Sequence, residues 1–168
     1  MRILTNEIAR YDRSGWFAIH MTEFKKAADV LIFNGKDKMA LQLRAAHDDS
    51  YPSHWDFSAG GGVDEGEEPP ATAEREIKEE LGVEAKVMLA AVMHYTYASW
   101  KPGLEREIDA WVYVAKHDGP FRPDPNEIQE VRFFSTEEIQ KRINEGWKFH
   151  PEFLCAWNDG TVERAARV

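Results

Sequence analysis

The segment from Gly61 to Val83 constrains the fold of this chain more than any other stretch. Pro69 and Pro70 suit the first positions of a helix, where an N–H has no partner within the helix, and Gly82 suits the left-handed residue that ends one. The segment therefore predicts a helix between these prolines and this glycine. Apolar residues at every fourth position give that helix one narrow buried stripe: Ala73, Ile77 and Leu81.

A second face of the predicted helix carries crowded carboxylates. Glu76, Glu79 and Glu80 are spaced three and four residues apart, so they are neighbours on the helix surface, where like charges destabilise each other. Hard divalent cations, in contrast, need several carboxylate oxygens at one point. A solvated acidic face is the alternative interpretation. The glycine run at 60–62 favours a metal site, because glycine lets backbone groups approach an ion or a phosphate closely.

These residues resemble a complete Nudix box. The fixed positions of that signature are Gly61, Glu67 after five residues, Arg75-Glu76-Ile77 after seven, then Glu79-Glu80 and Gly82-Val83 after one residue each. Every fixed position is present at its spacing, so the signal is far more specific than a lone glycine motif. The resemblance extends more loosely from about Ala27 to about Trp157, and it implies a Nudix fold.

The order of the predicted elements indicates an α+β fold with a mixed β-sheet, because strands surround the box helix and helices come last. We expect strands at 27–33, 39–44, 56–59, 87–97, 105–115 and 131–134, with shorter candidates at 3–4 and 16–19. A capping box at 135–138 begins a helix that ends near Gly146, and residues 151–157 form another. The tail from Glu163 is expected to fray. The resemblance implies the same architecture, a Nudix-type α/β/α sandwich formed by a single domain over residues 1–168.

The resemblance assigns roles to the box. The metal ligands it implies are Glu76, Glu79, Glu80 and the Gly60 carbonyl. Arg75 would hold one of these glutamates in place, since Arg75 and Glu79 are one helical turn apart. Glu67 precedes the helix, where negative charge is favourable, and would mainly orient its neighbours. The implied ion is Mg²⁺, with Mn²⁺ as the alternative; such an ion offsets phosphate charge and lowers the pKa of a bound water.

The general base stays open at this point. The resemblance allows a glutamate of the box or one from a separate loop, so Glu79, Glu107 and Glu127 are all candidates. Glu107 shares one side of a predicted strand with Glu105 and Asp109, by the period of two. That row is either an exposed acidic edge or a second row facing the metal.

Substrate contacts are expected around the glycine run and at the end of one strand. Gly61 and Gly62 would contact the substrate through their backbone. Arg44 ends the predicted strand 39–44, where it is either an exposed charge or a phosphate clamp that uses its planar guanidinium.

Beyond the box, the order QLR, YPSHWDFSAGGGV and GLEREIDAWVY resembles the isopentenyl-diphosphate isomerase branch of the Nudix fold. Arg44 matches its phosphate-binding arginine, and Glu105 and Glu107 match a Glu-x-Glu pair used for metal binding and proton transfer. Two positions depart from that branch. Gly60 stands where the isomerases have an acid/base cysteine, and Gly62 where they have a metal-binding histidine. A hydrolase related to the isomerases is therefore favoured over an isomerase.

Bulk properties narrow the class of protein. A net charge of −9 argues against a nucleic-acid polymer as the partner, since such surfaces are normally basic. The single cysteine, Cys155, excludes an internal disulfide and a multi-cysteine metal site. No apolar run approaches the roughly 20 residues that span a bilayer, and no signal-peptide core is visible. A cytoplasmic protein without a membrane segment is expected.

Three functions remain in competition. The leading one is a Mg²⁺-dependent hydrolase that cleaves a pyrophosphate linkage in a nucleoside diphosphate derivative or a related small molecule. An isoprenoid diphosphate isomerase and a non-catalytic nucleotide-sensing module are the alternatives, and a homodimer is left open. The substrate loops at 45–55, 98–104 and 117–126 carry no motif. Four aromatic residues could stack a base or simply pack: Tyr95, Tyr97, Trp100 and Phe121.

Overall fold

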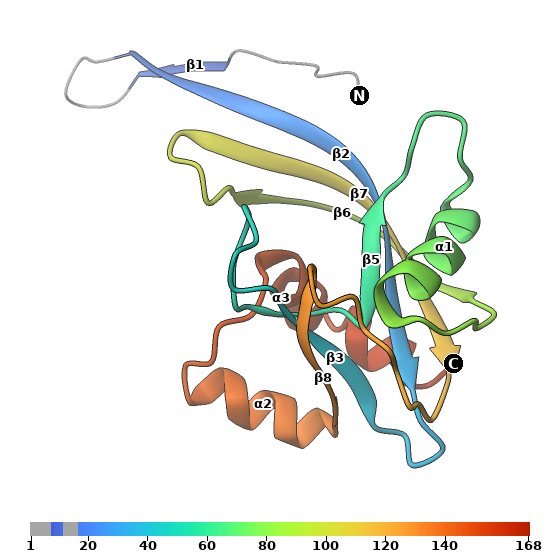
Figure 1. Ribbon diagram of the computed structural model, residues 1–168. Helices are drawn as coiled ribbons and strands as arrows, with labels where there is room; N and C mark the ends of the chain where they lie inside the picture. The colour runs from blue at the N-terminus through green and yellow to red at the C-terminus, as the bar shows by residue number, and fades with distance from the viewer. Residues whose placement is uncertain (1–7, 12–16) are drawn as a thin grey trace.

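The computed structural model describes residues 8–11 and 17–168, with side chains from Thr22 onward (Figure 1). Its strands are β1 (Ile8–Tyr11), β2 (Phe17–Phe33), β3 (Met39–Arg44), β4 (Trp55–Asp56), β5 (Ala59–Gly62), β6 (Met88–Ala98), β7 (Leu104–Lys116) and β8 (Ile128–Phe134). Its helices are α1 (Pro69–Leu81), α2 (Thr136–Asn144), α3 (Pro151–Asn158) and α4 (Thr161–Ala165). The candidate strand at 3–4 lies outside the described residues.

The strands form a mixed sheet. Its main path follows the order β4-β3-β2-β7-β6, while β1 and β5 pair with β2 and β8 pairs with β3. β2 and β7 run parallel, and the other pairs of these strands are antiparallel. Helix α1 and helix α3 lie on different sides of this sheet (Figure 1). The predicted α+β fold with a mixed sheet is confirmed.

Strand β2 is much longer than the predicted strand 27–33. Its register against β7 continues from Met21 opposite Leu104 to Phe33 opposite Lys116. The prediction followed the apolar run, but residues 22–26 are mostly polar and extend because a parallel partner satisfies their backbone groups. This extension carries Lys25 beyond the apolar core, where it contributes to the site described below.

Two clusters of buried side chains fix the layers. On one face, α1 packs its predicted stripe against β2 and β7, and all three stripe residues are fully buried: Ala73, Ile77 and Leu81. On the other face, α3 and α4 pack against the alternate residues of the same strands, with Phe153 at the centre. Since successive strand residues point to opposite faces, each strand serves both cores.

The ends of α1 follow from its sequence. Pro69 and Pro70 occupy its first turn, and Gly82 ends it with a left-handed φ of 64° while its N–H donates to the Lys78 carbonyl. A Cβ at position 82 would lie 2.7 Å from the Arg122 carbonyl oxygen, so glycine is required there for space as well as for conformation.

Two local expectations are wrong. The glycines at 60–62, which follow the expected strand 56–59, belong to the extended strand β5, which pairs with β2. The expected strand 56–59 is accordingly divided between β4 and β5. The tail does not fray throughout, because Thr161–Ala165 forms α4 and buries Val162 and Ala165 in the core. Two apolar residues in a short polar segment are too few to predict a buried helix from the sequence.

Truncating the end of the α1 stripe should weaken the fold. We expect Leu81→Ala to lower the free energy of unfolding by about 2–5 kcal/mol, because it leaves a cavity in a fully buried site. Leu89→Ala is the matched control, since Leu89 is 49% exposed on β6 and should change stability far less. Denaturant unfolding of both variants measures the difference; equal losses would contradict the packing of α1.

Candidate functional site

The glycine strand β5 lies directly against two glutamates of α1. The Gly60 N–H donates to Glu80 Oε2 at 2.9 Å, and a Cβ at position 61 would collide with the Glu76 carboxylate. Glycine at position 61 therefore admits the Glu76 carboxylate to the strand. In a β-strand, the N–H and C=O of one residue point to the same side. The Gly60 carbonyl thus faces the side on which Glu80 lies.

Burial raises the pKa of both carboxyls. Glu80 is only 7% exposed, and its burial raises its pKa to about 8 even though the Gly60 N–H and the Gln42 amide donate to it. Burial also raises the pKa of Glu76, against the opposing effect of Arg75. The negative charge of Glu127 adds to both shifts. The loop that carries Glu127 meets the end of α1, where the Asp124 N–H donates to the Glu80 carbonyl at 3.0 Å.

Arg75 holds the remaining glutamates of the box. Its Nη1 donates to Glu76 Oε1 at 2.6 Å and to Glu79 Oε2 at 2.9 Å, while Nε and Nη2 donate to the two Glu67 oxygens at 3.0 and 3.1 Å. These bonds lower the pKa of Glu67 to about 2, with a further contribution from the Thr72 hydroxyl. Arg75 thus aligns three carboxylates along α1.

The donor set fits a hard divalent cation. A buried Glu80 and a partly buried Glu76 present carboxyls of raised pKa beside the Gly60 carbonyl, which is the ligand chemistry that Mg²⁺ and Mn²⁺ take. In the part of the chain that the structure describes, no group of three or more His, Cys, Asp or Glu side chains is already gathered as an ion site. Arg75 Nη1 instead donates to both Glu76 and Glu79 in this structure. A cation here would take over bonds that the guanidinium now makes.

The candidate bases occupy different surroundings. Glu79 is 59% exposed at its side chain and is bonded to Arg75, and Glu127 is exposed beside the box carboxylates. Glu107 has another partner, because His94 on β6 lies 3.4 Å from Glu107 Oε1 and 2.8 Å from Asp109 Oδ1. The structure therefore groups Glu107 with His94 and not with the box glutamates.

A polar cavity of about 260 Å³ lies beside β5. It opens on the sheet face opposite α1, because it is lined by Lys25, Ala27 and Asp29, whereas Ala28 and Val30 pack under α1. The glycines of β5 form one wall, so the cavity and the box carboxylates share that strand.

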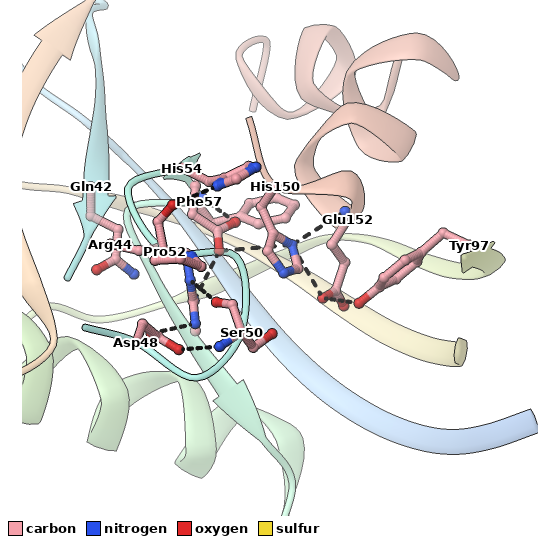
Figure 2. Close-up of polar contacts among 12 residues, drawn as sticks. Gln42, Arg44, Asp48, Ser50, Pro52, His54, Phe57, Tyr97, His150 and Glu152 are labelled. Atoms are coloured by element: carbon pink, nitrogen blue, oxygen red, sulfur yellow. Dashed lines mark hydrogen bonds and ion pairs between the residues drawn. The ribbon is translucent and has the colours of Figure 1, made fainter. Parts of the chain in front are cut away.

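Arg44 lies at the edge of this cavity and is not a freely exposed strand end. Its guanidinium donates to Asp48 at 2.6 Å, to Asp56 at 3.3 Å and to the Ser50 carbonyl at 3.1 Å, as Figure 2 shows in part. The side chain is 22% exposed and lines the cavity beside Gly62. Its planar fork is therefore fixed in orientation by the loop that follows β3.

A chain of polar side chains continues from Asp56 to His150, Glu152 and Tyr97, the last three of which are labelled in Figure 2. His150 Nδ1 lies 3.8 Å from Asp56 Oδ2 and 3.9 Å from Glu152 Oε2, and it accepts the Glu152 N–H at 3.3 Å. Burial lowers the pKa of His150. Tyr95 and Tyr97 donate their hydroxyls to Glu152 at 3.2 and 3.4 Å. Burial, reinforced by Asp56, raises the pKa of Glu152 to about 7.

The sequence analysis missed most of this cavity. Asp29, Arg106, His150 and Glu152 line it, and none of them was a candidate. Asp29 carried a usable signal, because a carboxylate inside the apolar run AADVLIF is costly unless it has a function or a partner. The other three come from β7, from α3 and from the N-cap residue of α3, and only the folded chain brings them together.

The four aromatic residues suggested for base stacking separate into two groups. Tyr95 and Tyr97 use their hydroxyls on Glu152, and Phe121 packs against Phe133 with ring centroids 5.7 Å apart. Trp100 stays 46% exposed in the β6–β7 turn. Packing thus explains three of them.

The mixed sheet, the acidic helix and the glycine strand together define a Nudix-type fold. A family model described as the NUDIX domain matches residues 23–157, and the chain belongs to this family. The match confirms the predicted family and supports the predicted class of enzyme, a Nudix pyrophosphohydrolase. Among the described residues, no helix has the length and apolar character needed to cross a bilayer.

Known relatives agree with the predicted branch. An uncharacterized Nudix hydrolase of Pseudomonas aeruginosa is 34% identical over 108 residues, which cover 64% of this chain and 61% of that protein, so the chain spans about three fifths of that relative. An isopentenyl-diphosphate Delta-isomerase of Haloarcula marismortui is 26% identical over 148 residues, covering 83% of this chain and 75% of the isomerase. The crystal structure of a MutT protein from Methanosarcina mazei superimposes with a TM-score of 0.66 at 21% identity, covering 86% of this chain and 94% of that one. The last likeness shows the fold.

A methyl group on Gly61 should disturb the metal site while leaving the fold intact. We expect Gly61→Ala to weaken Mn²⁺ binding by about tenfold or more, because the Glu76 carboxylate must move away from β5. Its stability should change little, since the colliding group is the end of a flexible side chain. Gly62→Ala is the control for metal affinity, as a Cβ there has only the Lys26 carbonyl at 4.0 Å. Calorimetric Mn²⁺ titration of both variants decides; equal affinities would contradict this arrangement.

Glu152 should make stability depend on pH. A carboxyl whose pKa rises from 4.5 to about 7 on folding keeps its proton in the native state over a range in which the unfolded chain releases it. Its contribution to stability is therefore complete below about pH 4.5 and is lost as the pH rises toward 7, with a limiting slope of about 1.4 kcal/mol per pH unit. Glu152→Gln should remove this slope. Denaturant unfolding between these pH values measures it, and parallel profiles for the two proteins would refute the buried carboxyl.

Proposed function

We propose that this protein is a Mg²⁺-dependent hydrolase that cleaves a pyrophosphate linkage in a small molecule, a nucleoside diphosphate derivative or a related compound, by attack of water at phosphorus. The observation that carries the proposal is the contact of Glu76 and Glu80 with the glycine strand. A buried and a partly buried carboxyl of raised pKa, beside a strand carbonyl, are costly in their charged forms unless a cation offsets the charge.

The residues divide the work as follows. Glu76, Glu79, Glu80 and the Gly60 carbonyl would hold the ion. When bound there, the ion supplies charge neutralisation on the phosphate oxygens and a water of lowered pKa. Arg75 positions Glu79 and Glu76, and Arg44 would clamp a phosphate at the cavity edge. Gly61 and Gly62 would offer their backbone groups to the substrate where β5 lines the cavity.

Proton removal from the attacking water requires a carboxylate near the box. Glu79 and Glu127 meet this condition, since one belongs to α1 and the charge of the other acts on Glu76 and Glu80. Glu107 is a weaker proposal because His94 engages it with Asp109. A base must lie within hydrogen-bond reach of its proton in the loaded complex, so we rank Glu79 and Glu127 first.

The isomerase alternative draws support from the similarity to the Haloarcula enzyme. Its acid/base thiol would have to occupy position 60, where this chain has Gly60. A Cβ at that position would lie 2.8 Å from Asp29 Oδ1 and 3.1 Å from the Ala28 carbonyl oxygen. Asp29 therefore fills the space that the side chain of an isomerase would need, which favours hydrolysis.

Hydrolysis should depend on the box carboxylates and on the metal. We expect Glu80→Gln and Glu79→Gln to lower kcat by at least about 100-fold on a panel of nucleoside diphosphate derivatives with Mg²⁺. Chelation with EDTA should abolish turnover, and added Mg²⁺ should restore it.

Glu84→Gln is the matched control, because Glu84 is exposed just beyond α1 and pairs only with Lys78 in the described structure. Release of nucleoside monophosphate, followed by chromatography, measures each rate. Full activity in both box variants would contradict the proposed metal site. Allylic interconversion of isopentenyl diphosphate would instead support the isomerase alternative. Saturable nucleotide binding without products would identify a sensing module.

A further inference from the structure

The sheet opens beside the glycine strand. Strand β5 pairs with β2 at residues 27–30, whereas β3 pairs with β2 only at Ile32 and Phe33. In the described sheet, β3 is paired further along with β4 and β8 and not with β5. The polar cavity lies at the opening between these two strands, because it is lined by Gln42 and Arg44 of β3 and by the glycines of β5.

Gln42 lies in this opening, between the box and the cavity. Leu41 and Leu43, its neighbours on β3, pack in the core under α3, so Gln42 points to the other face, toward α1. Its Nε2 donates to the two carboxyl oxygens of Glu80 at 3.3 and 3.4 Å, and the same side chain lines the cavity. One side chain thus contacts a box carboxylate and borders the cavity.

The backbone that carries Gln42 is held on both sides. Gln42 lies opposite Asp56 of β4 and Val131 of β8 in the two ladders, and its N–H donates to the Phe57 carbonyl at 3.4 Å. Its side chain is only 4% exposed. A donor on a paired strand places a neighbouring group more precisely than a donor on a loop does.

Glu80 receives hydrogen bonds from two strands. The Gly60 N–H of β5 donates to its Oε2 at 2.9 Å, and the Gln42 amide of β3 contacts both of its oxygens. The last torsion of a glutamate is broad when nothing restrains it, so donors from two strands together select one orientation of the carboxylate. An ionised carboxylate has about four acceptor sites, which leaves sites on Glu80 for an ion.

The neutral amide of Gln42 differs in its effect from the guanidinium of Arg75. Arg75 is a cation that pairs with Glu76 and Glu79, so an ion bound to these carboxylates would compete with it. An amide donates a hydrogen bond without a net charge, so it does not repel a cation beside Glu80. A buried amide is costly without a hydrogen bond, and in the described structure the side-chain hydrogen bonds of Gln42 go to Glu80 alone.

We propose that Gln42 is a positioning residue of the ion site, which holds the Glu80 carboxylate in the orientation that the divalent ion needs. Gln42 acts through Glu80 and does not itself bind the ion. This inference rests on the proposed function, since it adds a residue to the same site. The alternative is that Gln42 only satisfies a buried carboxyl, in which case the affinity for the ion does not depend on it.

Removing this donor should weaken the ion site. Gln42→Met keeps a side chain of similar length without a hydrogen-bond donor, and Gln42→Asn keeps the amide but shortens its reach. We expect each variant to weaken Mn²⁺ binding by about tenfold or more, as changes beside metal ligands commonly do. Gln140→Met is the matched control, because Gln140 is exposed on α2, where its amide bonds Asn144 and Trp157, and it should keep the wild-type affinity.

Calorimetric Mn²⁺ titration of Glu80→Gln beside these variants separates this inference from the proposed function. Denaturant unfolding identifies the Gln42 variants that fold, and these decide. Weaker binding in Glu80→Gln and in the folded Gln42 variants supports the inference. Weaker binding in Glu80→Gln with wild-type affinity in a folded Gln42 variant overturns the inference alone. Wild-type affinity in Glu80→Gln would remove Glu80 from the ion site, so the proposed function would lose this ligand and the inference would fall with it.

Discussion

The contact between the glycine strand and the acidic face of α1 is the constraint on which the rest of the site depends. Gly61 has no side chain where the Glu76 carboxylate lies, and the Gly60 N–H fixes Glu80. The opposite stripe of α1 is buried against β2 and β7, so the helix cannot turn without exposing Ile77 and its neighbours. Hydrophobic packing on one side thereby holds like charges together on the other, at a cost that a cation would offset.

Strand β5 also separates two chemical environments by the thickness of one backbone. On its helix side lie the carboxylates of Glu76 and Glu80, and on its other side lies the polar cavity. Gly60 belongs to both, since its N–H bonds Glu80 and its Cα faces Asp29. A substrate that contacts both sides of β5 would place its phosphates between the box carboxylates and the cavity, close to Arg44.

Sequence patterns predicted the helices whose ends and buried faces depend on neighbouring residues. Proline, glycine and the four-residue apolar period located α1, and the capping box at Ser135 located α2. The cavity could not be predicted, because it needs β2, β7 and α3 at one place. Alternation correctly put Glu107 and Asp109 on one side of β7, but the register that sets His94 opposite Asp109 is a tertiary choice. The length of β2 is set by its pairing with β7 and not by the composition of its residues.

The guanidinium of Arg75 already sits among the carboxylates that would receive a metal. In the proposed complex, a divalent ion that engages Glu79 would compete with this guanidinium, so the apparent affinity for the ion would be the difference between two sets of interactions. Such competition would weaken the net binding of the ion. A chelator should therefore remove the ion easily. Without a bound ion, the same arginine offsets part of the negative charge of Glu67, Glu76 and Glu79.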